Sequence, residues 1–333
     1  MNKATLISEM QKFHAGSKVF YSDGEEGILV HTNFDPSTRR LTSIGVKQGR
    51  FFGKTVNLPF NTVIKASSDG ITLNIKRGET PASGTTETGG ALLDSKTVVV
   101  RDDSTHKGPL ILVAVEPETG ELAYLVAHNL RQSQDSLIRA EYVTSLGTEQ
   151  VKVTVPDDIF YSLPPYRPDS DLQGDVEAVL FDLTPLHVDM KGITARVLDG
   201  VLYLDGNISS ALRGDIVQDQ ALGVPGILEI KNNLVGDDRL AADIAMALGQ
   251  DPRTRDLPIG VYPRLGVVRL SGAVRNGQQK AAAGEIAQNF PGVRSIINDL
   301  LVDPKANILN VMSSAEGGEA KDKVPGKYIR HTK

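Results

Sequence analysis

The stretch Gly200-Val-Leu-Tyr-Leu-Asp-Gly206 returns 66 residues later as Gly266-Val-Val-Arg-Leu-Ser-Gly272. The same offset extends without a gap from residues 193–235 to residues 259–301, and eleven of these 43 pairs are identical. Chance alone would give only a few identities over this length. The C-terminal half of the chain therefore contains an internal duplication, which decides how its fold is interpreted.

The sequence pattern of each copy predicts an α+β unit. The quoted stretches have strand composition and are flanked by glycines. A helical stretch follows each of them, and a Pro-Gly pair then ends the helix and begins a last strand. An earlier helix is expected over residues 171–183 and again over 238–248, where Leu240 and Ile244 share one face with Leu248. The predicted order is α-β-β-α-β, with the two copies at residues 171–235 and 237–303.

The N-terminal half is also duplicated, with an offset of 81. Gly27-Ile-Leu-Val30 lies over Gly108-Pro-Leu-Ile111, and Pro36-Ser-Thr38 lies over Pro117-Glu-Thr119. Both copies have short strands with period-two alternation, which are interrupted by turns. We therefore expect two small β units, at residues 16–76 and 95–162.

Four further segments connect or flank these units. Glycine, serine and threonine dominate residues 77–90, which is typical of a flexible linker, whereas prolines stiffen residues 163–170. Leu6, Met10 and Phe13 have helical spacing. The sequence thus predicts an N-terminal helical segment (1–15), a flexible linker (77–94), a Pro-rich linker (163–170) and a disordered tail (307–333).

Composition excludes several classes of protein. The 333 residues include no cysteine, so disulfides and thiolate metal sites are ruled out. The net charge is −5, which gives no global attraction to nucleic acid and makes it an unfavoured partner. No apolar run is long enough to span a membrane, and Glu9 and Lys12 interrupt the region where a signal peptide has its apolar core. We expect a soluble cytoplasmic protein, peripheral to the membrane if it meets one.

The N-terminal copies resemble PRC-barrel domains. The resemblance rests on Gly16-Ser-Lys-Val19, Asp23-Gly24-Glu-Glu-Gly27 and Pro36-Ser-Thr38 in the first copy. The second copy departs from the pattern, because Ala140 stands where the first has Pro59. The resemblance implies a small β-barrel in each copy and an adaptor role without catalysis.

The C-terminal copies resemble BON domains. Leu265-Gly-Val-Val-Arg-Leu-Ser-Gly272 matches the family's strand–glycine–strand core, and Pro291-Gly-Val293 matches the turn before its final strand. The resemblance implies association with phospholipid or envelope surfaces. The expected fold class is a multidomain chain of two small all-β PRC-type barrels followed by two α+β (αββαβ) BON-type domains.

Candidate catalytic and metal-binding motifs are incomplete. Gly53-Lys54-Thr55 is similar to the end of a phosphate-binding loop, but Gln48 occupies the position where that loop needs glycine. His187-Val-Asp189 offers two metal ligands without a third. There is no Gly-x-Ser-x-Gly nucleophile motif. We therefore predict no catalytic residue, no cofactor, no metal and no enzymatic activity.

The first β copy has a basic region with two phenylalanines, Phe51 and Phe52. This region would contact anionic lipid headgroups, RNA phosphate or an acidic protein. The alternative is a solvated face with both phenylalanines in the core, which the negative net charge favours. The candidate residues for an anionic partner are Arg39, Arg40, Lys47, Arg50 and Lys54.

These observations predict a non-enzymatic adaptor that binds a protein partner or an anionic membrane surface through its BON and PRC-barrel units. Exposed sheet edges leave self-association into a homo-oligomer open. The alternative function is a ribosome- or RNA-associated factor that uses the basic region of the first barrel.

Overall fold

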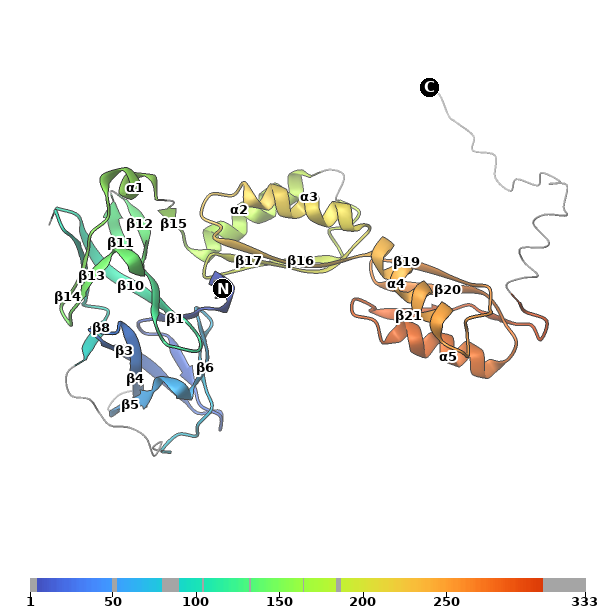
Figure 1. Cartoon of the computed structure of the whole chain (residues 1–333), viewed down its shortest axis with the longest axis horizontal. Helices are drawn as coiled ribbons and strands as arrows, with labels where there is room; N and C mark the ends of the chain where they lie inside the picture. Colours follow the sequence, from blue (N-terminus) through green and yellow to red (C-terminus); the bar gives the residue numbers. More distant parts are fainter. Residues whose placement is uncertain are drawn as a thin grey trace, which may run out of the picture. The chain divides into compact units, whose positions relative to one another are not determined.

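The computed structural model describes residues 5–49, 53–79, 90–103, 105–131, 133–163, 165–183 and 187–307 (Figure 1). The chain divides into two compact units. The first consists of the residues up to His187 together with 194–205 and 216–233, and the second of 188–193, 206–215 and the residues from Leu234 onward. The protein is therefore a multidomain α+β chain.

The first N-terminal sheet contains the first β copy. Its order is β5-β4-β3-β2-β7-β6, and the β2–β7 pair is parallel, so the sheet is mixed. A 3-10 helix, η2 (Phe60–Thr62), joins β5 to β6. The strands are β2 (Lys18–Phe20), β3 (Glu26–Asp35), β4 (Arg40–Gln48), β5 (Thr55–Pro59), β6 (Val63–Ser67) and β7 (Gly70–Leu73).

The second N-terminal sheet contains the second β copy, in the order β13-β14-β9-β10-β11-β12-β15, with a parallel β14–β9 pair. The 3-10 helix η3 (Ala140–Tyr142) and the short helix α1 (Asp157–Ser162) accompany it. The strands are β9 (Val98–Arg101), β10 (Lys107–Val115), β11 (Leu122–Arg131), β12 (Gln134–Arg139), β13 (Val143–Leu146), β14 (Gln150–Val153) and β15 (Pro165–Tyr166). The N-terminal half therefore consists of two large mixed sheets, and the closed barrels expected from the sequence stay a prediction.

The two β copies exchange a strand. β1 (Gln11–His14) immediately precedes the first copy but pairs antiparallel with β10 of the second, with Phe13 opposite Val113. β8 (Ala91–Asp94) immediately precedes the second copy but pairs antiparallel with β3 of the first, with Leu93 opposite Thr32. These two strands occupy equivalent places in the duplicated sequence, so the exchange is reciprocal.

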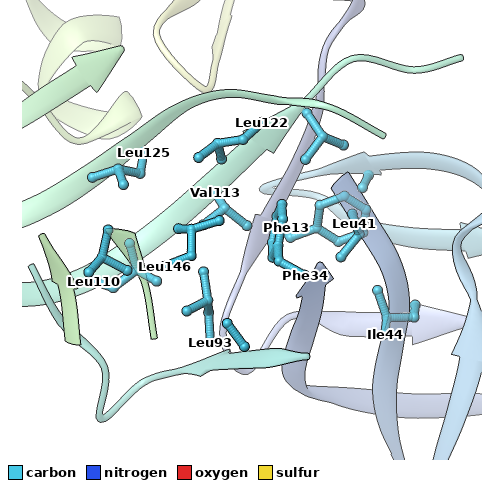
Figure 2. Packing of buried hydrophobic residues seen from close by; sticks show 14 of the residues in the cluster. Phe13, Phe34, Leu41, Ile44, Leu93, Leu110, Val113, Leu122, Leu125 and Leu146 are labelled. Atoms are coloured by element: carbon cyan, nitrogen blue, oxygen red, sulfur yellow. The ribbon is translucent and has the colours of Figure 1, made fainter. Parts of the chain in front are cut away.

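One apolar core serves both copies as a result. Phe13 of β1 is buried in it beside Val113 of β10, the strand that receives β1, and Phe34 of β3 is buried there with Leu93 of β8 (Figure 2). Neither copy therefore completes its core from its own strands. This sharing also overcomes the limit on small domains, which bury too little surface to be robust alone.

The predicted segments between and before the β copies differ from expectation. Instead of a helix over residues 1–15, the structure has a short 3-10 helix, η1 (Ile7–Glu9), followed by β1. Burial of Phe13 and pairing with β10 outweigh the helical spacing of Leu6, Met10 and Phe13. Of the predicted linker 77–94, residues 80–89 lie outside the described residues and residues 91–94 form β8. Residues 308–333 of the predicted tail also lie outside.

The C-terminal copies have the predicted order of elements. In the first copy β16, β17 and β18 form a three-stranded sheet in that order, and in the second β19, β20 and β21 do, with β22 pairing to β20. The elements of the first copy are α2 (Asp169–Asp182), β16 (Ile193–Leu198), β17 (Val201–Ile208), α3 (Ala211–Leu222) and β18 (Glu229–Gly236). Those of the second are α4 (Asp237–Gln250), β19 (Ile259–Arg264), β20 (Val267–Val274), α5 (Gly277–Gln288), β21 (Ser295–Asn298) and β22 (Leu301–Val302).

In the second copy both helices cover the same face of the sheet. Leu240, Ile244 and Leu248 of α4 form the predicted apolar stripe and pack against Val268 and Leu270 of β20. Ala283 and Ala287 of α5 complete this core. Because neighbouring side chains on a strand point to opposite faces, the other face of the sheet carries the residues between these positions.

Within the described residues, no helix is both long and apolar enough to cross a membrane.

An acidic residue in the first turn of one helix holds the hairpin in each copy; Asp237 is buried, and Asp169 is partly buried. Asp237 accepts hydrogen bonds from the backbone N–H groups of Leu265 (2.6 Å) and Gly266 (3.2 Å). Asp169 does the same for Asp199 (2.7 Å) and Gly200 (2.9 Å). Both residues of each turn have positive φ, as a type I′ hairpin requires. The shared hydrogen bonds support the duplication inferred from sequence.

Replacing this carboxylate is expected to destabilise the second copy. Asp237→Ala leaves two backbone N–H groups without their acceptor, at a cost of about 1–3 kcal/mol in the free energy of unfolding. Asp243→Ala is the control, because this residue of the same helix is half exposed, and it should change stability by less than about 0.5 kcal/mol. Urea unfolding followed by circular dichroism measures both variants. Equal stability of the two would show that the hairpin does not depend on Asp237.

Candidate binding surface

Two of the predicted basic residues are engaged between the β copies. The Arg39 guanidinium donates a hydrogen bond to the carbonyl oxygen of Ala140 at 3.0 Å. Arg40 forms an ion pair with Glu121 at 3.8 Å, and both side chains are half exposed. Arg39 therefore has a structural contact across the duplication, which sequence analysis did not foresee.

Lys47 and Lys54 lie toward the opposite end of β4 from Arg40. Lys47 is opposite Thr55 in the β4–β5 pair, and the exposed Lys54 immediately precedes β5. Arg50 lies outside the described residues, as do Phe51 and Phe52. At about 3.3 Å per residue, the seven steps from Arg40 to Lys47 span about 23 Å. The structure does not bring the four described residues into one patch.

The second α+β copy has a different candidate surface, on the face of its sheet opposite the helices. Tyr262 of β19 and Ile297 of β21 lie on either side of Arg269 of β20 as its direct partners. Arg264 lies at the end of β19 on the same face, and Leu301 follows the buried Leu300. Tyr262 is 60% exposed, Ile297 39% and Leu301 70%. We call Tyr262, Arg264, Arg269, Ile297 and Leu301 the open face.

A glycine lets the tyrosine ring lie along the sheet. Gly260 is two residues before Tyr262 on the same side of β19, and a Cβ atom placed on it would lie 2.7 Å from the Tyr262 ring. That distance is far below a normal van der Waals contact. The ring therefore rests over the Gly260 backbone and presents its other side outward.

The charge of the open face is partly balanced by one carboxylate. Asp299 lies 3.4 Å from Nε of Arg269, and both side chains are more than half exposed. Such exposed pairs contribute about 0–1 kcal/mol, so solvent or a ligand can displace them. With Arg264 and Arg269 against Asp299, the face keeps an excess of one positive charge. This positive charge, together with the exposed apolar side chains, suits binding at the interface between water and an anionic lipid layer.

The family model described as the BON domain matches residues 236–304. Residues 236–304 form a BON domain. This match confirms the resemblance inferred from the strand–glycine–strand core of the second copy, and the open face is part of this BON domain.

The chain is also similar to characterised proteins. It is 27% identical over 150 residues to osmotically-inducible protein Y of Escherichia coli (strain K12), a match that covers 40% of this chain and 73% of the relative. The chain also matches a solved structure of CdsD, a structural protein of the type III secretion system of Chlamydia trachomatis, and spans 66% of that solved chain, just under two thirds of its length. This match covers 44% of the present chain, with a TM-score of 0.33 and 17% identity. The C-terminal domain of CdsD gives a TM-score of 0.34 at 16% identity, covering 45% of this chain and 71% of that domain.

The equivalent face of the first α+β copy differs from that of the BON domain. At an offset of 66, Arg196 replaces Tyr262 and Glu229 replaces Ser295. Arg196 forms an ion pair with Asp69 of the first β copy. Glu229 accepts hydrogen bonds from the backbone N–H (3.0 Å) and hydroxyl (2.8 Å) of Ser8. In the first copy Glu229 holds the N-terminal segment and Arg196 pairs with the first β copy, whereas the BON domain has no such charges at the same positions.

A buried charged cluster completes this packing in the first unit. His14 Nε2 lies 2.8 Å from an Asp199 carboxylate oxygen, and the backbone N–H of Ser68 donates to the other at 3.0 Å. Burial raises the pKa of Asp199, but the hydrogen bond from His14 and the charges of His14 and Lys12 outweigh it and hold this pKa below its usual value. Lys12 is only 3% exposed, and burial lowers its pKa although Asp199, Glu229 and Asp169 oppose the shift. The cluster therefore has a structural role, because it joins the N-terminal segment, the first β copy and the first α+β copy.

The remaining candidate ligands from the sequence are engaged separately. Asp189 accepts hydrogen bonds from the Ser209 backbone N–H (3.0 Å) and from Arg213 (2.7 Å). His187 Nε2 lies 2.7 Å from the Phe181 carbonyl oxygen. Across the described part of the chain, no group of three or more potential ligands could hold a metal ion.

Proposed function

We propose that this chain is a non-catalytic binding protein whose BON domain associates with anionic phospholipid surfaces through the open face. The observation that carries the proposal is the combination of exposed apolar and aromatic side chains with two arginines on one face of the BON sheet. BON domains are linked to phospholipid binding, which supports the choice of ligand. Distant similarity to osmotically-inducible protein Y, which is also a BON-type protein, supports a role without catalysis.

The charges and apolar side chains of the open face would act together at a membrane. A basic residue near an anionic leaflet contributes about 1 kcal/mol. Leu301, Ile297 and Tyr262 would each gain by leaving water, because full burial of a large apolar side chain is worth about 1.5–3 kcal/mol. A single BON domain would therefore bind weakly and reversibly, as expected for a peripheral protein.

Vesicle flotation tests the proposal. The wild type should float with vesicles of phosphatidylglycerol and phosphatidylcholine, and Tyr262→Asp combined with Leu301→Asp should lower its affinity by at least about tenfold, since 1.4 kcal/mol corresponds to that factor. Met246→Asp is the matched control, because Met246 is 61% exposed but belongs to α4, on the other face of the sheet. Equal loss of binding in both variants would refute the role of the open face.

We further propose that the N-terminal β copies are PRC-type units that serve as the adaptor part of the chain and bind a protein partner. The duplicated turn motifs support this assignment. No structural observation favours the alternative of an RNA- or ribosome-associated factor, because the described basic residues of the first copy lie toward the two ends of β4. Sedimentation with ribosomes in the absence of vesicle binding would nevertheless reverse this ranking.

A further inference from the structure

Arg269 occupies the centre of the open face. Tyr262 and Ile297 are its direct neighbours on the two adjacent strands, so a lipid surface that meets these side chains also meets its guanidinium. A guanidinium can offer two parallel N–H donors to a phosphate oxygen pair. Arg269 is therefore the residue of this face best placed to bind a lipid phosphate.

Asp299 already contacts this guanidinium. Asp299 is the residue that follows β21, and its carboxylate lies 3.4 Å from Nε of Arg269. A lipid phosphate must compete with this carboxylate for Arg269 and must also approach its negative charge. Both effects disfavour a sparsely charged membrane more than a densely charged one, because the attraction of a dense surface potential is greater.

The ion pair is not a requirement of the αββαβ fold. In the first copy the positions equivalent to Arg269 and Asp299 are Tyr203 and Asn233, at an offset of 66. Asn233 donates a hydrogen bond to Asp205 at 3.0 Å and lies within the regular strand β18. An amide at this position is therefore compatible with the fold, so the carboxylate needs another explanation.

We infer that Asp299 sets the anionic lipid density at which the open face binds, by competing with lipid phosphate for Arg269. This inference rests on the proposed function of the BON domain. The residue acts on specificity: it makes the face reject membranes with few anionic lipids. Removing its charge broadens binding to such membranes.

The test compares full-length wild type and Asp299→Asn on vesicles with increasing phosphatidylglycerol in phosphatidylcholine. Asp299→Asn is expected to bind about fivefold more tightly at intermediate phosphatidylglycerol content and to reach half-maximal binding at a lower content. Asp243→Asn is the matched control: it removes the same charge from an exposed ion pair with Arg239 at 3.8 Å on α4, on the helical layer. It should change affinity by less than about twofold.

A second comparison shows whether Asp299 acts through Arg269. In the Arg269→Gln background, Asp299→Asn should no longer increase binding beyond the effect of Asp243→Asn. If the wild type binds but Asp299→Asn behaves like Asp243→Asn, the inference is overturned while the proposed function stands. If neither the wild type nor Asp299→Asn binds vesicles of any composition, the proposed function fails and the inference with it.

Discussion

Phe13→Ala is expected to lower the free energy of unfolding of the N-terminal half by about 3–5 kcal/mol, the usual cost of truncating a buried phenylalanine. The Phe13 ring is 2% exposed and lies edge-on to Phe60, with 6.4 Å between ring centroids. It comes from the exchanged strand β1, so the cavity would open in the core that both β copies share. The loss should therefore affect both copies together.

Hydrogen exchange with mass spectrometry distinguishes a loss of stability shared by both β copies from a local effect. In Phe13→Ala, protection should fall in β3 of the first copy and in β10 of the second to a similar degree. Phe181→Ala is the control, because this phenylalanine is 67% exposed, and it should cost less than about 0.5 kcal/mol. Loss of protection confined to residues 16–76 would mean that the two copies are independently stable and that the shared core is not a cooperative unit.

Asp199→Ala has the second large expected effect, a loss of about 3–5 kcal/mol, because removing one partner of a buried ionic cluster leaves the opposite charge uncompensated. Here Lys12, which is 3% exposed, loses the nearby carboxylate with the largest effect on it, His14 loses its ion-pair partner, and the Ser68 backbone N–H loses its acceptor. Asp199→Asn keeps an acceptor oxygen and should cost less. Urea unfolding of the full chain at neutral pH measures all three proteins.

The same residue has a defined pH dependence. The pKa of Asp199 is lower in the folded protein than its usual value, so its charged form contributes stability above about pH 4, the unfolded pKa. This contribution is lost as the pH falls through the folded pKa. The stability difference between the wild type and Asp199→Asn should therefore narrow as the pH falls below about 4. A difference independent of pH down to 3 would contradict an ionised Asp199.

The open face shows how far sequence could go towards a site. None of its five residues was singled out from sequence, although strand alternation places Tyr262 and Arg269 on the side away from Leu270. Superposing the two copies would have shown that Arg196 becomes Tyr262, but not that Arg196 is held by Asp69. The basic residues that sequence did select are neighbours along the chain. Arg40 and Lys47 lie toward opposite ends of a nine-residue strand, because an extended strand separates residues that a list of charges groups together.

The amino-acid sequence by itself determined the two duplications, the α-β-β-α-β order, the helix stripe of Leu240, Ile244 and Leu248, and the BON-type unit expected at 237–303, which the family match at 236–304 confirms. These features depend on local periodicity, turn glycines and internal similarity, which neighbouring residues encode. Only the tertiary structure decided that β1 and β8 exchange between the β copies, that Lys12 and Asp199 are buried together, and which face of the BON sheet stays exposed. The physical reason is that each of these depends on contacts between residues far apart in the chain, and their packing energy outweighs local preference, as it does where Gln11–His14 form a strand.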